Sequence, residues 1–258
     1  MKKYFDQKIT LITSGSKGFG YELCKHFSQF PNNHVIMASK SRKEGERSRT
    51  ALEKEVGVKL SYIEMNKNDP DSLDRTLSMV RSKFGKLDIL INNESFTFTE
   101  LTKFLDVQVK TFIQTFALNI SSSFYTMKAF LPLMKENKYG RIVNVGSCIG
   151  NLESMREPML SCYLLSQFSL KSLTKILSEA VNPKQIKINA FDLNYSLYKY
   201  KKHKQLDEWN IANQEKLIKN TGIAPFIHYL TQLDDNGPTG SYFEDPKAIG
   251  PSTLNKLC

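Results

Sequence analysis

The chain is poor in cysteine and histidine and has no long hydrophobic run. Its four histidines are scattered, and its four cysteines form no CxxC pair; these are Cys24, Cys148, Cys162 and Cys258. Without metal-ligand spacing we expect no metal site and reduced thiols. Because no apolar stretch reaches the roughly 18 residues that a membrane span needs, we also expect no membrane partner.

The first residues lack the features of a secretory signal. Their apolar stretch, residues 9–12, is too short for a signal core and leads directly into a glycine-rich loop. We interpret it as the first strand of the fold. The sequence therefore predicts a cytoplasmic protein.

Acidic residues are fewer than basic ones. The chain has 36 Lys and Arg against 26 Asp and Glu, a net charge of +10. Nucleic-acid-binding proteins share such a balance, but here the excess is scattered except in YKYKKHK at 198–204. We interpret it as a basic solvated surface and expect no nucleic-acid partner.

Strand and helix patterns alternate along the 258 residues. This alternation is typical of a doubly wound α/β fold with a parallel sheet, and the length suits one domain spanning residues 1–258. The expected strands are 8–13, 34–39, 59–65, 87–92, 141–146, 185–191 and 240–243. The expected helices are 19–30, 42–56, 70–84, 102–137 and 161–180, and Pro132 is expected to bend or end the fourth.

The segment TSGSKGFG, residues 13–20, lies between a predicted strand and a predicted helix. At such a junction glycines permit a tight turn and a close approach of the backbone to a pyrophosphate, which rests on the helix amino end. The position directly after the first strand makes this a candidate dinucleotide-binding loop.

Five motifs follow one another in a fixed order. The glycine loop is followed by LDILINN at 87–93, ALNIS at 117–121, NVGS at 144–147 and Tyr163 at the start of a helix. Together they resemble the short-chain dehydrogenase/reductase family over essentially the whole chain, and DNGPTGSYFEDPKAI at 235–249 resembles its carbonyl-reductase-like members. The resemblance implies a Rossmann-type sheet flanked by helices on both faces, and an oxidoreductase acting on a small-molecule carbonyl substrate.

The resemblance assigns catalytic roles to four positions. The family's active-site asparagine matches Asn119, which shapes a helix kink and holds a water molecule. Its serine matches Ser147, which hydrogen-bonds the substrate carbonyl, and its tyrosine matches Tyr163, which gives or takes the proton. The family's lysine position is occupied by Gln167.

The same resemblance predicts the cofactor site. The expected cofactor-binding residues are Ser14, Gly15, Ser16, Lys17, Gly18, Phe19, Gly20, Lys40, Arg42, Asn66, Asn92, Tyr163 and Gln167. Lys17, Lys40 and Arg42 place cations where a 2′-phosphate would lie, and no acid follows the second strand. An acid there favours NAD, so we expect NADP(H).

The chain departs from the family pattern at five places around one ligand. The first loop glycine is Ser14, where Gly15 is expected to allow the turn. Asn66 replaces an acid near the adenine. Glu94-Ser95 replaces Ala-Gly, Leu193-Asn194 replaces Pro-Gly, and Gln167 replaces the lysine.

Loss of the lysine affects the tyrosine most. Gln167 can still hydrogen-bond a ribose, but it cannot lower the tyrosine pKa, and Lys171 lies about 12 Å beyond Tyr163 along the helix. A tyrosine of pKa ~10 is only about 0.1% ionised at pH 7. We therefore expect activity biased toward reduction. A non-catalytic dinucleotide sensor or scaffold with a degenerate active site, and a non-redox enzyme on this fold, stay open as alternatives.

Two further expectations concern surfaces. Residues 195–220 are expected to cover the substrate as a lid. Family members commonly dimerise through the two long helices, so we expect a homodimer or homotetramer. The apolar side chains that favour this are Phe112, Phe116, Phe124, Phe130, Leu164, Phe168 and Leu177.

Overall fold

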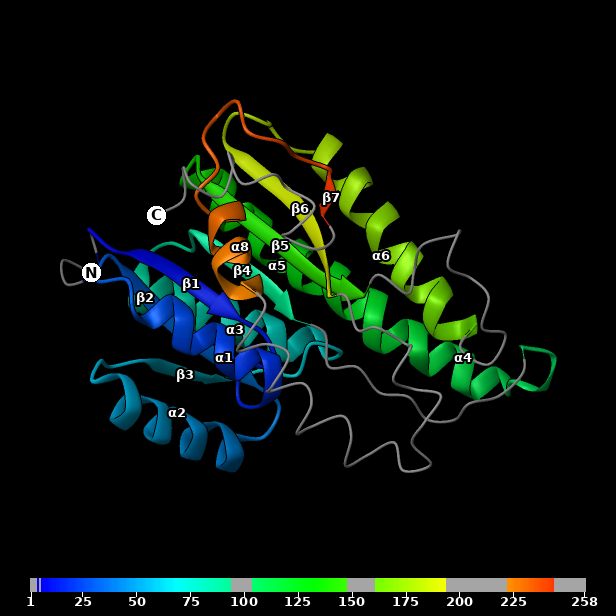
Figure 1. Ribbon diagram of the computed structural model, residues 1–258, viewed down its shortest axis with the longest axis horizontal. Coiled ribbons are helices and arrows are strands. Elements are labelled where there is room, and N and C mark those ends of the chain that lie inside the picture. The colour runs from blue at the N-terminus through cyan, green and yellow to red at the C-terminus, as the bar shows by residue number, and fades with distance from the viewer. Residues whose placement is uncertain (1–3, 5, 94–103, 148–160, 194–221, 244–258) are drawn as a thin grey trace.

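A single parallel sheet forms the centre of the molecule (Figure 1). The computed structural model describes residues 4, 6–93, 104–147, 161–193 and 222–243. Seven strands pair in the order β3-β2-β1-β4-β5-β6-β7, and every pairing is parallel. The strands are β1 (Lys8–Ile12), β2 (Asn33–Ser39), β3 (Ser61–Glu64), β4 (Ile89–Asn93), β5 (Gly140–Ser147), β6 (Ile186–Leu193) and β7 (Tyr242–Phe243).

Helices cover both faces of this sheet. They are α1 (Gly18–Ser28), α2 (Arg42–Val56), α3 (Pro70–Phe84), α4 (Val109–Phe116), α5 (Ser122–Glu136), α6 (Ser161–Glu179) and α8 (Ile223–Leu230). A 3-10 turn, η2 (Phe104–Asp106), precedes α4, and a π-helical turn, η3 (Ala117–Ser121), joins α4 to α5. The predicted doubly wound α/β fold of the Rossmann type is therefore confirmed.

Two hydrophobic clusters, one on each side of the sheet, form the core. On one side α1, α2 and α8 pack on side chains such as Ile12 and Val143. On the other side α3, α5 and α6 pack on side chains such as Leu11 and Ile142. Neighbouring residues of a strand enter opposite clusters because strand side chains alternate between the two faces.

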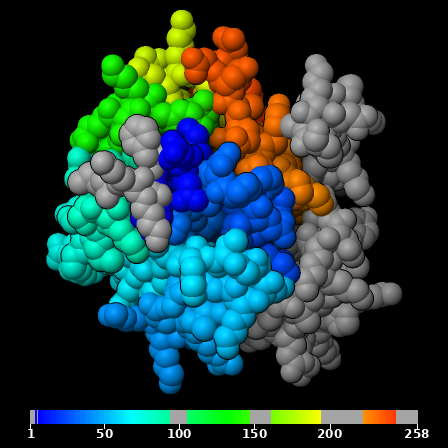
Figure 2. All heavy atoms as spheres, turned by 90° about the vertical axis from the view of Figure 1, so that its left-hand side faces the viewer, coloured from blue at the N-terminus to red at the C-terminus, as the bar shows by residue number. Residues whose placement is uncertain are grey.

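Helix α8 and the loop after it lie against α1 at the edge of the molecule. Figure 2 shows the orange C-terminal segment directly beside the blue N-terminal part of the chain. The His228 ring of α8 stacks on Phe30 just beyond α1, with a centroid distance of 3.8 Å. The sequence analysis did not predict this helix.

The sequence predicts that Pro132 bends or ends its helix, and the structure shows that the helix does not end there. Helix α5 continues through Pro132 to Glu136. Proline removes one helical hydrogen bond and costs about 3 kcal/mol, but Leu131, Leu133 and Met134 beside it are buried in the core. Burial of these side chains offsets the cost, since each large apolar side chain contributes about 1.5–3 kcal/mol.

The described ranges contain neither a candidate membrane span nor a candidate metal cluster. Within residues 4, 6–93, 104–147, 161–193 and 222–243, no helix is both long and apolar enough to cross a membrane. Over those same ranges, no group of three or more His, Cys, Asp or Glu side chains is placed to hold a metal ion.

Candidate active site

The sheet reverses its winding direction between β1 and β4. These two strands are neighbours, with Thr10 opposite Ile89 and Ile12 opposite Ile91. From β1 the sheet continues through β2 and β3, and from β4 it continues through β5 and β6. Open parallel sheets bind ligands outside the carboxyl ends of the strands at such a switch point. The predicted glycine loop follows β1 at this position.

Hydrogen bonds hold the glycine loop to the strands on both sides. The Gly15 amide donates to the Ala38 carbonyl of β2 at 2.9 Å. On the other side the Thr13 hydroxyl accepts from the Asn93 amide at 2.9 Å and donates to the Asn93 carbonyl at 3.2 Å. The loop is therefore fixed to β2 and β4, the two strands on either side of β1.

Ser14 itself adopts the left-handed backbone conformation of the loop. Its φ is +50°, whereas Gly15 is absent from the positive-φ residues of the described chain. The expectation that Gly15 would relieve this turn is therefore wrong. Gly15 has another constraint, because a Cβ there would lie 3.0 Å from Cys24 Sγ and 3.1 Å from the Ile12 carbonyl oxygen.

The amino end of α1 differs from those of α2 and α3. Ser41 caps α2 and Asp69 caps α3 with their side chains, whereas Lys17 gives α1 no side-chain cap and the first turn contains no acid. A Cβ on Gly20 would lie 2.3 Å from the Ser14 carbonyl oxygen. This glycine therefore lets α1 approach the loop closely, and its amino end can receive an anion.

The loop side chains divide into exposed and buried ones. Lys17 is exposed, Gly18 is partly exposed with φ +53°, and Ser16 is 9% exposed. Phe19 is buried and packs into the core on the α1 side of the sheet. Its side chain therefore anchors the start of α1.

The residues after β2 and β3 lie at the same edge of the sheet as this loop, because the three strands are parallel. Ser39 is buried at the end of β2, while Lys40 and Arg42 are exposed on either side of Ser41. Asn66 follows β3; its amide donates to Ser72 Oγ at 3.0 Å, and its side-chain oxygen accepts from the Asn68 amide at 3.3 Å. Asn66 thus shapes the turn that leads into α3.

Asn92 and Asn93 end β4 with different surroundings. Asn92 is fully buried, and its side-chain amide donates to Asn144 Oδ1 of β5 at 2.8 Å. Asn93, which the sequence analysis did not single out, makes both backbone contacts to Thr13, and its Nδ2 lies 2.8 Å from where a Cβ on Gly20 would stand. The adjacent Asn-Asn pair in the sequence is the feature from which Asn93 could have been identified.

Asn119 and Tyr163 are brought together through Ser166. Asn119 lies in the π-helical turn η3, at the predicted position of a helix kink. Its side-chain amide donates to Ser166 Oγ at 2.9 Å, and that hydroxyl donates to the Tyr163 carbonyl at 2.7 Å. Both predicted residues are buried.

Gln167 lies one helical turn after Tyr163, near an ion pair that the sequence analysis missed. Lys171 Nζ lies 2.6 Å from Asp192 Oδ2, and Asp192 is 1% exposed. A Cβ on Gly146 would lie 3.1 Å from Gln167 Oε1 and 2.8 Å from Asp192 Oδ1, so both oxygens border this glycine. The sequence feature that could have indicated a buried charge pair is Asp192, an acid within the otherwise apolar strand INAFDL.

Ser147 is the last residue of β5, in register with Leu193 of β6. It therefore ends its strand at the same edge of the sheet as the glycine loop. Glu94-Ser95, Asn194, the predicted lid at 195–220 and the tail from residue 244 lie outside the described residues.

Comparison with known proteins agrees with this fold. The sequence model of the short chain dehydrogenase family matches residues 8–206. The chain belongs to that family. It is 28% identical over 193 residues to the D-beta-hydroxybutyrate dehydrogenase of Rhizobium meliloti (strain 1021), covering 74% of this chain and 72% of that protein. It is 27% identical over 186 residues to the 3-oxoacyl-(acyl-carrier-protein) reductase FabG of Escherichia coli (strain K12), covering 72% of each.

Solved structures share the fold at lower identity. An NAD+-bound xylitol dehydrogenase superposes with a TM-score of 0.77 at 20% identity, covering 93% of this chain and 98% of that one. The L-sorbose reductase of Gluconobacter frateurii, complexed with NADPH and L-sorbose, gives a TM-score of 0.71 at 17% identity, covering 93% of this chain and 95% of that one. The fold thus occurs with either nicotinamide dinucleotide.

Proposed function

We propose that the protein is an NADP(H)-dependent reductase of a small carbonyl compound. The observation that carries this proposal is the uncapped amino end of α1 beside the switch point, together with the basic residues that accompany it. The amino end of α1 has neither a capping side chain nor an acid. Lys17 at the start of α1 and Lys40 and Arg42 after β2 are exposed, and β2 itself ends in Ser39 rather than in an acid.

The loop fits a dinucleotide on steric and electrostatic grounds. Gly20 lets the α1 amino end approach the Ser14 backbone closely, and a pyrophosphate placed there would meet the first N–H groups of the helix. A 2′-phosphate on the adenosine ribose adds negative charge, which Lys40 and Arg42 would attract. Arginine in particular binds phosphate with a bidentate fork.

The bound dinucleotide would supply a hydride to the carbonyl carbon of the substrate. In this proposal Ser147 hydrogen-bonds the carbonyl oxygen and Tyr163 donates a proton to it. Asn119 positions the Tyr163 turn through Ser166. The segment 195–220 would cover the substrate.

Gln167 would bias this chemistry toward reduction. Its amide can hydrogen-bond the nicotinamide ribose but adds no positive charge beside Tyr163, so the phenol stays protonated at neutral pH. A protonated phenol is the form that carbonyl reduction requires. Alcohol oxidation requires the phenolate and should be slower by roughly 10²–10⁴-fold than with a tuned base.

A fluorescence titration with NADPH, with NADH in parallel, tests the cofactor. We expect tighter binding of NADPH. Lys40→Ala and Arg42→Ala should each weaken NADPH binding by roughly 10- to 150-fold and leave NADH binding nearly unchanged, because each removes a charged contact worth roughly 1.5–3 kcal/mol. Lys54→Ala is the matched control, since Lys54 is exposed in the last turn of α2. Equal binding of NADH, or no binding of either, would contradict the proposal.

A screen of carbonyl compounds with NADPH then tests the reaction. Consumption of NADPH that is lost in Tyr163→Phe would support the reductase. Tight NADPH binding without turnover of any carbonyl would instead favour a non-catalytic dinucleotide sensor.

A further inference from the structure

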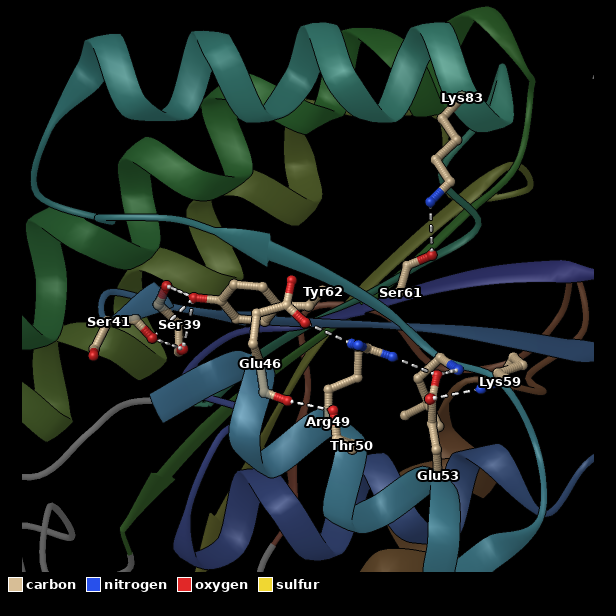
Figure 3. A network of polar contacts seen from close by, with 11 residues as sticks. Ser39, Ser41, Glu46, Arg49, Thr50, Glu53, Lys59, Ser61, Tyr62 and Lys83 are labelled. Atoms are coloured by element: carbon tan, nitrogen blue, oxygen red, sulfur yellow. Dashed lines mark hydrogen bonds and ion pairs between the residues drawn. The ribbon is translucent and has the colours of Figure 1, made fainter. Parts of the chain in front are cut away.

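Tyr62 connects three elements beside the end of β2 (Figure 3). Its hydroxyl lies 3.1 Å from the Ser39 carbonyl oxygen, 3.0 Å from the Ser41 carbonyl oxygen and 3.3 Å from Ser39 Oγ. The phenol comes from β3, Ser39 ends β2 and Ser41 caps α2. One hydroxyl therefore joins the two carbonyls on either side of Lys40.

The aromatic ring of Tyr62 occupies space that only a glycine in α2 leaves open. A Cβ on Gly45 would lie 2.0 Å from Tyr62 Cε2, 2.3 Å from Cζ and 2.7 Å from the hydroxyl oxygen. Glycine in a helix interior costs about 1 kcal/mol relative to alanine. Here that residue lets the ring pass beneath the first turns of α2 and reach the turn at residues 39–41.

Further backbone hydrogen bonds fix the conformation of the turn at residues 39–41. The Ser39 carbonyl accepts from the Met65 amide at 2.9 Å, and the Ser41 carbonyl accepts from the Gly45 amide at 2.9 Å. The preceding residue, Ala38, accepts the Gly15 amide of the glycine loop at 2.9 Å. The turn that carries Lys40 is thus directly connected to the phosphate-binding loop.

The charges around Tyr62 are compatible with a donor role. Burial raises the pKa of its phenol, with smaller contributions from Glu64 and Glu46, so the hydroxyl keeps its proton at neutral pH. The nearby Glu46 is itself paired with Arg49, whose Nε lies 2.8 Å from Glu46 Oε2. Lys40 and Arg42 both project from the turn into solvent.

We propose that Tyr62 is a positioning residue for cofactor selectivity: it fixes the turn at residues 39–41 so that Lys40 and Arg42 meet a 2′-phosphate on the adenosine ribose. This inference rests on the proposed NADP(H) function. Tyr62 acts through the two carbonyls and does not touch the nucleotide. Gly45 contributes to the same positioning because the absence of a Cβ makes room for the Tyr62 ring.

Tyr62→Phe tests the hydroxyl while keeping the ring on Gly45. Dissociation constants are measured for NADPH and NADH, and for their adenosine ends, 2′,5′-ADP and 5′-AMP. We expect NADPH and 2′,5′-ADP to weaken about 3- to 10-fold, as loss of one net hydrogen bond predicts. NADH and 5′-AMP should change less than about twofold. Tyr21→Phe is the matched control. The Tyr21 hydroxyl donates to Glu55 Oε2 at 3.3 Å, a contact that does not involve the turn at residues 39–41.

Gly45→Ala provides an independent test, because the added Cβ must displace the Tyr62 ring. It should reduce the NADPH preference as Tyr62→Phe does, and the double variant should be no worse than either single one, since both changes disable one interaction. Equal weakening of all four ligands in Tyr62→Phe would mean a purely structural role and overturn the inference while leaving the NADP(H) proposal intact. Failure of the unmodified protein to bind any of the four would overturn both.

Discussion

Ser14 shows how a single residue departs from its family and still keeps the local backbone. It holds φ +50° in the loop that faces the switch point, a conformation that costs a residue with a Cβ roughly 1–2 kcal/mol and glycine almost nothing. We expect Ser14→Gly to raise the free energy of unfolding by about 1 kcal/mol, measured by urea denaturation. Lys138→Gly, at φ +53° away from the site, should stabilise by a similar amount. No gain in either variant would contradict this account of strain.

Gln167 is the residue on which we expect the direction of catalysis to depend. We expect Gln167→Lys to raise alcohol oxidation at pH 7 by at least about tenfold, because an ammonium near Tyr163 lowers the tyrosine pKa and increases the phenolate fraction. The pH profile of oxidation should shift to lower pH. Gln167→Met is the control for side-chain length without charge. The buried Asp192 carboxylate borders the same glycine as Gln167, so an unchanged rate and profile would mean that Asp192 draws the new ammonium away from Tyr163.

At the scale of elements, the contact between α1 and α8 contains two partly buried histidines. Burial and the neighbouring His26 lower the pKa of His228 to about 4, and burial lowers that of His26. The His228 ring also packs on Phe27 and Phe30, and Gln232 Nε2 lies 3.4 Å from its Nε2. Protonation of either ring therefore opposes the packing of α8 on α1.

The sign of the resulting pH dependence follows from these pKa values. Above about pH 6.5 His228 is neutral in both folded and unfolded chains and has no effect. Between about 6.5 and 4 the unfolded chain binds a proton that the folded one does not, so stability falls as pH decreases. We expect His228→Phe to flatten the decrease of Tm over this range, measured by thermal denaturation at several pH values. An identical slope in the variant would show that other groups cause it.

The elements that could be predicted well from the sequence have a strong hydrophobic period and recognisable capping residues at their ends. Helix α3 begins at Pro70 with Asp69 as its cap and ends before Gly85, so these end signals in the sequence are enough to predict its bounds. Helix α8 was missed because its apolar residues extend over only eight positions and follow an unpatterned segment. The Lys171–Asp192 pair depends on β6 and α6 meeting in space, and the spacing of the two residues along the chain does not reveal it.

The structure brings part of the predicted site together, and the catalytic roles of its residues stay predictions. Asn119 and Tyr163 could be proposed from the sequence because each lies in a short motif of fixed order. Tyr62 could not, since its proposed role depends on a glycine in α2 and two carbonyls beyond β2. Contacts between backbone and side chain across three elements leave no local pattern in the sequence.

At the scale of the whole molecule, we expect the exposed faces of α4 and α6 to decide whether copies of the chain associate. Family members commonly form oligomers, and these two helices pack beside each other. The structure corrects part of the predicted surface: Phe130 and Leu164 are 0% and 3% exposed and belong to the protomer core. Over α4, η3, α5 and α6 the exposed large apolar side chains are Val109, Phe112, Ile113, Leu118, Tyr125, Phe168 and Ile176.

We expect this surface to bury itself against a second copy and form a homodimer or homotetramer, because water contact with so many apolar side chains is unfavourable. Ile113 and Ile176 are 60% and 66% exposed, so Ile113→Lys with Ile176→Lys should produce a monomer without unfolding it. Light scattering coupled to size-exclusion chromatography measures the mass. Met79→Lys is the matched control, since Met79 is 48% exposed on α3, and it should leave the oligomer intact. A monomeric unmodified protein would contradict the assembly itself, and an oligomer that survives both lysines would place its interface elsewhere.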